Sequence, residues 1–214
     1  MPSSRPTRLV LPRLYAIVDA DHLHGPTSKS VCETLLDAGV RLFQYRDKNG
    51  SSRRIFEATS TLLPMIRAAG GRLLVNDRAD VALVAGADGV HLGQDDLTAE
   101  EARQVLKPGQ IVGCSTHNLD QLRRADASPA DYLAFGPIFA TRSKERPDPT
   151  VGLDALWRAR QATSKPLVAI GGITVENARA AIEHGADAVA VIAGLLNAPD
   201  LGGRTREFME LLSG

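Results

Sequence analysis

The sequence predicts an α/β protein folded as a single (β/α)8 TIM barrel. Eight short apolar runs rich in strand-forming residues alternate with longer segments whose apolar residues recur at helical spacing. Alternating strands and helices with short connections imply a parallel sheet, and eight such units close into a barrel. The rival, an open doubly wound sheet, normally has a glycine-rich loop after its first strand, whereas this chain has Asp19-Ala20-Asp21-His22 there.

Each expected strand is followed by a helical pattern. The strands are expected at 14–18, 41–46, 72–75, 88–92, 110–114, 131–135, 166–170 and 187–192. Side chains able to cap free backbone amides mark several helix starts. These are Ser51 or Ser52, Thr98 with Glu101, and Thr174 with Asn177.

Length and composition set the broad class. With 214 residues, of which 43% are apolar and 23% charged, the chain suits one well-buried core. We expect one catalytic barrel domain over residues 14–214, preceded by a flexible tail over residues 1–13. The 25 basic and 25 acidic residues balance, which argues against nucleic-acid binding, and no apolar run approaches the roughly 18 residues of a membrane-spanning helix. Cys32 and Cys114 lie in apolar segments and are expected to be reduced, buried thiols of a cytoplasmic protein.

The active site of a β/α barrel lies at the carboxyl ends of its strands, so the residues that follow each strand are informative. The second strand ends in Gln44, Arg46 and Lys48, which share one side of the strand, while Phe43 and Tyr45 share the other. A guanidinium, an ammonium and an amide together form a candidate anion clamp in the barrel mouth. The alternative is a solvated, charged strand end.

Carboxylates follow the third and fourth strands. Asp77 comes directly after one, and Asp95 and Asp96 after the other. Magnesium often uses one or two carboxylates together with substrate phosphates, so Asp77 and one of Asp95 or Asp96 are candidate ligands. Capping of the following helices is the alternative for each aspartate.

The last four strand ends carry hydroxyls, small residues and a long loop. Ser115-Thr116-His117 follows the fifth strand, and a loop containing Thr141 to Lys144 follows the sixth. Gly171-Gly172 and Ile192-Ala193-Gly194 follow the last two strands, where β/α barrels usually bind phosphate. Tight turns also use glycine, so the glycine pair alone has an alternative explanation.

The histidines have no assigned catalytic role. We expect His22 and His24 in loops and His184 at an exposed helix end, while His91 and His117 approach the mouth. A packed or hydrogen-bonded structural role is favoured for both of the latter.

Taken together, six ordered motifs between about residues 14 and 210 resemble those of the thiamine phosphate synthase (thiamine-phosphate pyrophosphorylase) family, a family of barrels. The motifs are Gln44-Tyr45-Arg46-Asp47-Lys48, Asn76-Asp77, His91-Leu92-Gly93-Gln94-Asp95-Asp96, Gly113-Cys114-Ser115-Thr116-His117, Gly136-Pro137-Ile138-Phe139 with Thr141-Arg142-Ser143-Lys144, and Ala169-Ile170-Gly171-Gly172-Ile173.

The resemblance implies a role for each motif. The pyrimidine pyrophosphate would be bound by Gln44, Tyr45, Arg46, Asp47, Lys48 and Asn76, with Ser115 and Lys144 also on the pyrimidine substrate. Mg²⁺ would be held by Asp77 and Asp96. The thiazole phosphate would be bound by Thr141, Ser143, Gly172, Ile192 and Ala193, and catalysis would depend on Arg46, Lys48 and Lys144.

The implied reaction joins 4-amino-5-hydroxymethyl-2-methylpyrimidine pyrophosphate to hydroxyethylthiazole phosphate, giving thiamine phosphate and pyrophosphate through a dissociative, Mg-assisted substitution. Two positions depart from the family's usual residues: Ser143 replaces a threonine, and Ala193 replaces a serine after the isoleucine of the eighth strand. The small-molecule substrates are the partners implied.

Two other functions are open. A thiazole tautomerase would share the barrel and the glycine pair but would need a proton-transfer residue such as His117, and no metal. A noncatalytic phosphate-ligand binding protein would use the same loops without turnover. Magnesium-dependent release of pyrophosphate distinguishes the synthase from both.

Overall fold

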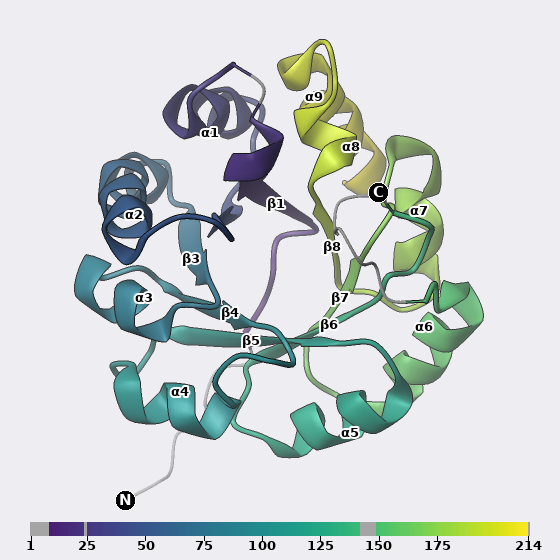
Figure 1. Ribbon diagram of the computed structural model, residues 1–214. Helices are drawn as coiled ribbons and strands as arrows, with labels where there is room; N and C mark the ends of the chain where they lie inside the picture. The colour runs from purple at the N-terminus through teal and green to yellow at the C-terminus, as the bar shows by residue number, and fades with distance from the viewer. Residues whose placement is uncertain (1–8, 24, 142–148, 214) are drawn as a thin grey trace, which may run out of the picture.

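The computed structural model describes residues 9–23, 25–141 and 149–213. Eight parallel strands close into a barrel in chain order, because β8 pairs with β1 and every other strand pairs with its successor. Figure 1 looks into the barrel, with the helices arranged around it. The predicted (β/α)8 fold and all eight predicted strands are confirmed. The strands are β1 (Leu14–Asp19), β2 (Leu42–Arg46), β3 (Arg72–Asn76), β4 (Gly89–Leu92), β5 (Ile111–Thr116), β6 (Tyr132–Phe135), β7 (Leu167–Ile170) and β8 (Ala188–Val191).

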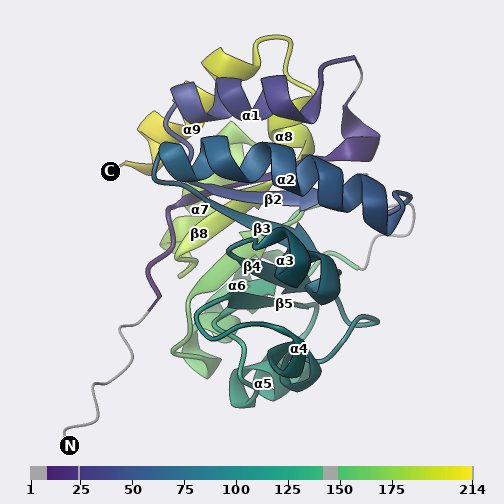
Figure 2. The same ribbon diagram turned by 90° about the vertical axis from the view of Figure 1, so that its left-hand side faces the viewer.

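Helices cover the outside of the barrel, and the last one packs against both α1 and α7 (Figure 2). A short 3₁₀ turn, η1 (Ala20–His22), follows β1. The helices are α1 (Ser28–Asp37), α2 (Ser52–Ala68), α3 (Ala79–Ala85), α4 (Ala99–Val105), α5 (Leu119–Ala127), α6 (Gly152–Ala162), α7 (Val175–Glu183), α8 (Ala193–Leu196) and α9 (Leu201–Leu212).

The predicted caps are present. The Ser51 side chain accepts a hydrogen bond from the Arg54 amide, which places the start of α2 at the first of the two candidate serines. Thr98 and Glu101 form the expected capping box at α4. At α7, the Asn177 side chain accepts from the Thr174 amide at 2.8 Å. These local interactions fix where helices begin beside the barrel mouth.

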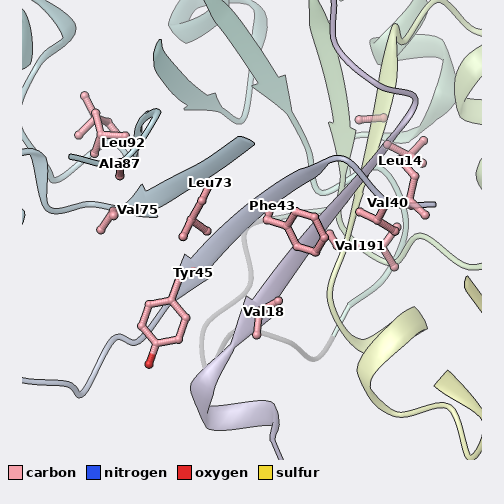
Figure 3. Close-up of a cluster of buried hydrophobic side chains, with 14 of the residues drawn as sticks. Leu14, Val18, Val40, Phe43, Tyr45, Leu73, Val75, Ala87, Leu92 and Val191 are labelled. Atoms are coloured by element: carbon pink, nitrogen blue, oxygen red, sulfur yellow. The ribbon is translucent and has the colours of Figure 1, made fainter. Parts of the chain in front are cut away.

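Side chains of the strands alternate between two hydrophobic clusters. The outer cluster lies between strands and helices and contains Phe43, Tyr45, Leu73 and Val75 (Figure 3). The inner cluster fills the barrel with residues such as Leu42 and Leu74. Phe43 and Tyr45 thus face the helices, and Gln44 faces the interior, as the alternation predicted.

Both cysteines are free thiols. Cys32 is buried, and its burial raises the pKa of the thiol to about 12. Cys114 is half-buried, and burial raises its pKa to about 11. Neither thiol is therefore a ready nucleophile near neutral pH.

The start of the chain falls partly outside the described residues, since the first eight are not among them. Leu11 is buried in the inner cluster, so this part of the predicted tail packs against the barrel. Within the described part of the chain, the helices all lack the length and apolar character needed to span a membrane.

Candidate active site

A cavity of about 340 Å³ opens at the carboxyl ends of the strands, on the side of β5 to β8. Small and apolar residues dominate its wall. The wall includes Ser115, His117, Gly136, Pro137, Thr141, Gly171, Gly172, Thr174, Ile192, Ala193 and Gly194. His22, which follows β1, completes the wall from across the mouth. We call this the small-residue pocket.

Charged side chains gather at the ends of β1 to β4. The Arg46 guanidinium forms an ion pair with Asp19, whose side chain is fully buried. His22 Nδ1 lies 3.4 Å from the same carboxylate. Asp19 therefore orients Arg46 at the rim and leaves it with donors for an anion, because a guanidinium carries five N–H groups.

Lys48 extends this group by pairing with Asp77. Asp77 adopts a left-handed backbone conformation, with φ of 63°, which is uncommon for a residue other than glycine. Such conformations cluster at functional sites. The helix cap of α3 is Arg78 and makes no side-chain capping bond, so Asp77 does not have the capping role that was the alternative.

Asp96 lies beside Asp77, and its carboxylate accepts a hydrogen bond from the Gly93 amide at 2.7 Å. Burial, followed by the interaction with Asp77, raises the pKa of the Asp96 carboxyl. Thr98 caps α4, so capping does not explain Asp96 either. Asp95 is exposed. Of the two acidic candidates on this loop, the structure therefore brings Asp96 to Asp77.

Two carboxylates and substrate oxygens would suffice for a hard cation such as Mg²⁺. Over the described ranges, no group of three or more His, Cys, Asp or Glu side chains is arranged to hold a metal by itself. The adjacent carboxyl groups of Asp77 and Asp96, the second of which has a raised pKa, fit a cation that takes its remaining ligands from a bound substrate.

Tyr45 and Asp47 direct their side chains away from the mouth. Tyr45 packs in the outer cluster, where burial raises the pKa of its phenol to about 12. The buried Asp47 carboxylate forms an ion pair with Arg54 of α2, with Oδ2 2.9 Å from Nε. Any contact of these two residues with a ligand in the mouth would come from their backbone.

Five polar side chains from five strands form a continuous hydrogen-bonded row through the barrel. Gln44 Nε2 donates to the Tyr15 hydroxyl at 2.8 Å, and that hydroxyl lies 3.0 Å from the Tyr132 hydroxyl. The Tyr132 hydroxyl is 2.7 Å from His91 Nδ1, and His91 Nε2 is 2.8 Å from Ser115 Oγ. We call these five residues the interior row. It ends at Ser115, which lines the small-residue pocket.

The glycine pair after β7 is required by close packing. Gly171 and Gly172 have φ of 95° and 65°. A Cβ atom on Gly172 would lie 2.4 Å from the carbonyl oxygen of Ala140, and one on Gly171 would lie 2.4 Å from Cβ of Pro137. The loop after β6 thus packs directly against the turn formed by the two glycines. Thr141 belongs to that wall, whereas Arg142, Ser143 and Lys144 lie outside the described residues.

Asn76, His117 and His184 lie at or next to the ends of strands and helices. Asn76 ends β3 beside His91 of β4 and is half-buried. His117 Nδ1 is 2.6 Å from the Gly136 carbonyl oxygen. His184 bonds the Ala180 carbonyl at the end of α7 and is half-buried rather than exposed, while His24 lies outside the described residues.

Four residues to which the sequence patterns assigned no role at the site lie at or beneath the mouth, namely Asp19, His22, Tyr15 and Tyr132. Asp19 is the last residue of β1 and His22 follows the strand, so the rule applied to the other strand ends would have found both. Tyr15 and Tyr132 lie within strands and resemble ordinary core aromatics. Their hydroxyl contacts join residues 117 positions apart, which local pattern does not reveal.

Comparison with known proteins identifies relatives of this chain. A family model described as thiamine monophosphate synthase matches residues 14–195. The chain is 54% identical over 213 residues to a thiamine-phosphate synthase of Koribacter versatilis strain Ellin345, covering 95% of this chain and 97% of that protein. It is 41% identical to one from Chloroflexus aurantiacus, covering 94% and 93%.

A solved structure, a thiamine phosphate pyrophosphorylase from Pyrococcus furiosus, is 33% identical and superposes with a TM-score of 0.85. The match covers 94% of this chain and 95% of that one. Fold, family model and identity over nearly the full length agree, and this chain therefore belongs to the thiamine monophosphate synthase family of transferases.

Proposed function

We propose that the enzyme joins 4-amino-5-hydroxymethyl-2-methylpyrimidine pyrophosphate to hydroxyethylthiazole phosphate and releases pyrophosphate. One observation carries the proposal. The side chains of Arg46 and Lys48, each paired with an aspartate, lie on one side of the barrel mouth, and the small-residue pocket lies on the other. A substrate with a pyrophosphate and a substrate with a single phosphate would each find a suitable side. Proximity in one mouth then favours their reaction.

Arg46 and Lys48 would bind the pyrophosphate oxygens, together with Lys144 from the loop outside the described residues. The Arg46 and Lys48 side chains are already oriented by Asp19 and Asp77, so they lose little conformational freedom when the pyrophosphate binds. Gln44, Asn76 and Ser115 would contact the pyrimidine. Tyr45 and Asp47 would contribute backbone groups.

Asp77 and Asp96 would hold Mg²⁺ against the pyrophosphate. Their adjacency and the raised pKa of Asp96 support this assignment, since a cation would relieve the repulsion between the two carboxylates. When bound, the ion would neutralise charge that develops on the leaving pyrophosphate.

The chemical step would be a dissociative substitution. The bond between the pyrimidine methylene carbon and the pyrophosphate oxygen breaks, and its electron pair leaves with pyrophosphate. The thiazole nitrogen then donates its lone pair to the methylene carbon. No proton moves in either event, so no protein base is required. Arg46, Lys48 and Lys144 would stabilise the growing negative charge.

The thiazole phosphate would occupy the small-residue pocket. Thr141 and Ser143 would offer hydroxyls, while Gly172, Ile192 and Ala193 would offer backbone amides. The large share of small residues in the wall supports this, because a phosphate can approach the backbone closely there. We also propose that the enzyme is cytoplasmic.

The first test is pyrophosphate release by the purified protein given both substrates, with magnesium and then with a chelator. We expect release that needs both substrates, stops with the chelator and returns when excess magnesium is added. Arg46→Gln should lower it by about 100-fold or more. Absence of release from the wild type, with the thiazole phosphate bound or isomerised, would instead favour a binding protein or a tautomerase.

A further inference from the structure

The interior row has a definite hydrogen-bond direction at its buried end. Gln44 Nε2 is an amide nitrogen, which donates and does not accept, so the Tyr15 oxygen is the acceptor. Burial raises the pKa of Tyr15 to about 12 and that of Tyr132 well above its usual value. Both phenols therefore keep their hydrogen, and each has one to donate.

Only one assignment of donors and acceptors in the interior row gives the Tyr15 hydroxyl hydrogen an acceptor. Among the described residues, the Tyr15 hydroxyl contacts Gln44 and Tyr132 and has no third hydrogen-bond partner. If Tyr132 donated to Tyr15, the Tyr15 hydrogen would be buried without an acceptor, and an unsatisfied buried donor is destabilising. Tyr15 must then donate to Tyr132, and Tyr132 must donate to His91 Nδ1.

A neutral histidine that accepts at Nδ1 carries its hydrogen on Nε2. His91 Nε2 faces Ser115 Oγ at 2.8 Å and would donate to it. The Ser115 oxygen is then an acceptor toward the protein, and its own hydrogen points away from His91. Since Ser115 lines the small-residue pocket, that hydrogen is available to a ligand in the mouth.

Packing holds the row rigidly. The His91 and Tyr132 rings stack with centroids 5.5 Å apart, and the Tyr15 and Tyr132 rings meet edge to face at 6.1 Å. Gly113 of β5 leaves the space that the Tyr132 phenol fills, because a Cβ atom there would lie 2.0 Å from Cζ of Tyr132. Tyr15, Gln44 and Tyr132 are at most 2% exposed.

We infer that the interior row fixes His91 in its Nε2–H tautomer and makes Ser115 a hydroxyl donor to an unprotonated ring nitrogen of the aromatic heterocycle bound in the mouth. This inference rests on the proposed function, in which that heterocycle is the pyrimidine. Tyr15, Tyr132 and His91 are positioning residues, and Ser115 is the group that touches the substrate.

The direct test reads the tautomer from ¹⁵N chemical shifts of the histidine rings in the full-length protein without substrate. His91 should show a protonated Nε2 and a bare, hydrogen-bonded Nδ1. Tyr132→Phe removes the donor to Nδ1 and should change that pattern, whereas Ser115→Ala should preserve it. A wild-type His91 with its hydrogen on Nδ1 overturns the inference, whether or not any variant folds.

The kinetic test separates substrate positioning from a general loss of stability. Tyr132→Phe and Ser115→Ala should each raise KM for the pyrimidine pyrophosphate by about 5- to 20-fold and leave KM for the thiazole phosphate unchanged. Thr59→Val is the matched control, because it removes a buried hydroxyl that donates to the Ile55 carbonyl within α2, away from the row. An unchanged pyrimidine KM in Tyr132→Phe would refute the inference.

The two proposals fail in different ways. A wild-type protein without magnesium-dependent pyrophosphate release contradicts the proposed function, while its histidine spectrum still decides the tautomer. Normal release with the wrong tautomer contradicts only the inference about the interior row.

Discussion

The two halves of the barrel mouth differ in the residues that form them. At the ends of β1 to β4, charged side chains pair with one another, as Arg46 does with Asp19 and Lys48 with Asp77. At the ends of β5 to β8, the wall combines glycine, alanine and proline with isoleucine and hydroxyl side chains, and no acidic or basic side chain other than histidine lines the described part of it. Ser115, at the end of the interior row, lies where the halves meet.

The two halves should respond differently to substitution. In the charged half, an isosteric change that removes one charge should alter binding or rate and leave the fold intact. In the small-residue half, one added methyl group should disturb packing, because the backbone of one loop lies directly against the next. The following substitutions test that contrast.

The largest effect is expected from Asp96→Asn. The amide keeps the shape but removes a proposed magnesium ligand, so turnover should fall by about 100-fold or more. Asp95→Asn is the matched control on the same loop, and its exposed side chain predicts near-normal rates. Magnesium-dependent pyrophosphate release at saturating substrates measures both. Normal turnover in Asp96→Asn would remove Asp96 from the metal site.

The same substitution should stabilise the protein in the presence of a chelator. The pKa of Asp96 is raised in the folded protein, so the folded state binds a proton more readily than the unfolded state. Its ionised form therefore weakens folding at neutral pH, and this penalty disappears as the pH falls below the pKa of the unfolded chain. Thermal unfolding should show a higher Tm for Asp96→Asn at pH 7 and no gain at strongly acid pH. An equal gain in Asp95→Asn would argue against this cause.

A smaller effect, on stability, is expected from Gly172→Ala. Gly172 and Gly86 have nearly the same φ, 65° and 68°, but only Gly172 has backbone within contact distance of an added methyl group. Both substitutions should incur the left-handed cost of about 1 to 2 kcal/mol. Gly172→Ala should lose several degrees of Tm beyond Gly86→Ala, since about 1 kcal/mol corresponds to 2–4 °C in a chain of this size. Equal losses would show that the loop contact is not rigid.

The smallest effect is expected from Ala193→Ser. The new hydroxyl would stand at the start of α8 in the pocket wall, where it could donate to the thiazole phosphate. One added hydrogen bond to a charged group predicts a KM for that substrate lower by about 3- to 10-fold. KM for the pyrimidine pyrophosphate should not change. An unaltered thiazole KM would indicate that backbone groups already satisfy the phosphate.

The alternation of strands and helices, with a strand period of two, determined the barrel from sequence alone. Those patterns are local, because each strand buries one set of side chains inward and another toward the helices. The same rule placed Gln44, Arg46, Asp77 and Asp96 at one end of the molecule without any knowledge of tertiary contacts.

Which polar groups meet at the site depends on how the strands pair and close into a barrel. Barrel closure gave Arg46 a buried partner in Asp19, joined Tyr15 to Tyr132 and placed the Asp96 carboxyl against Asp77. These contacts link different strands, and their partners depend on register and barrel closure. Local propensity determines each strand, but closure of the sheet brings together the side chains that form the site.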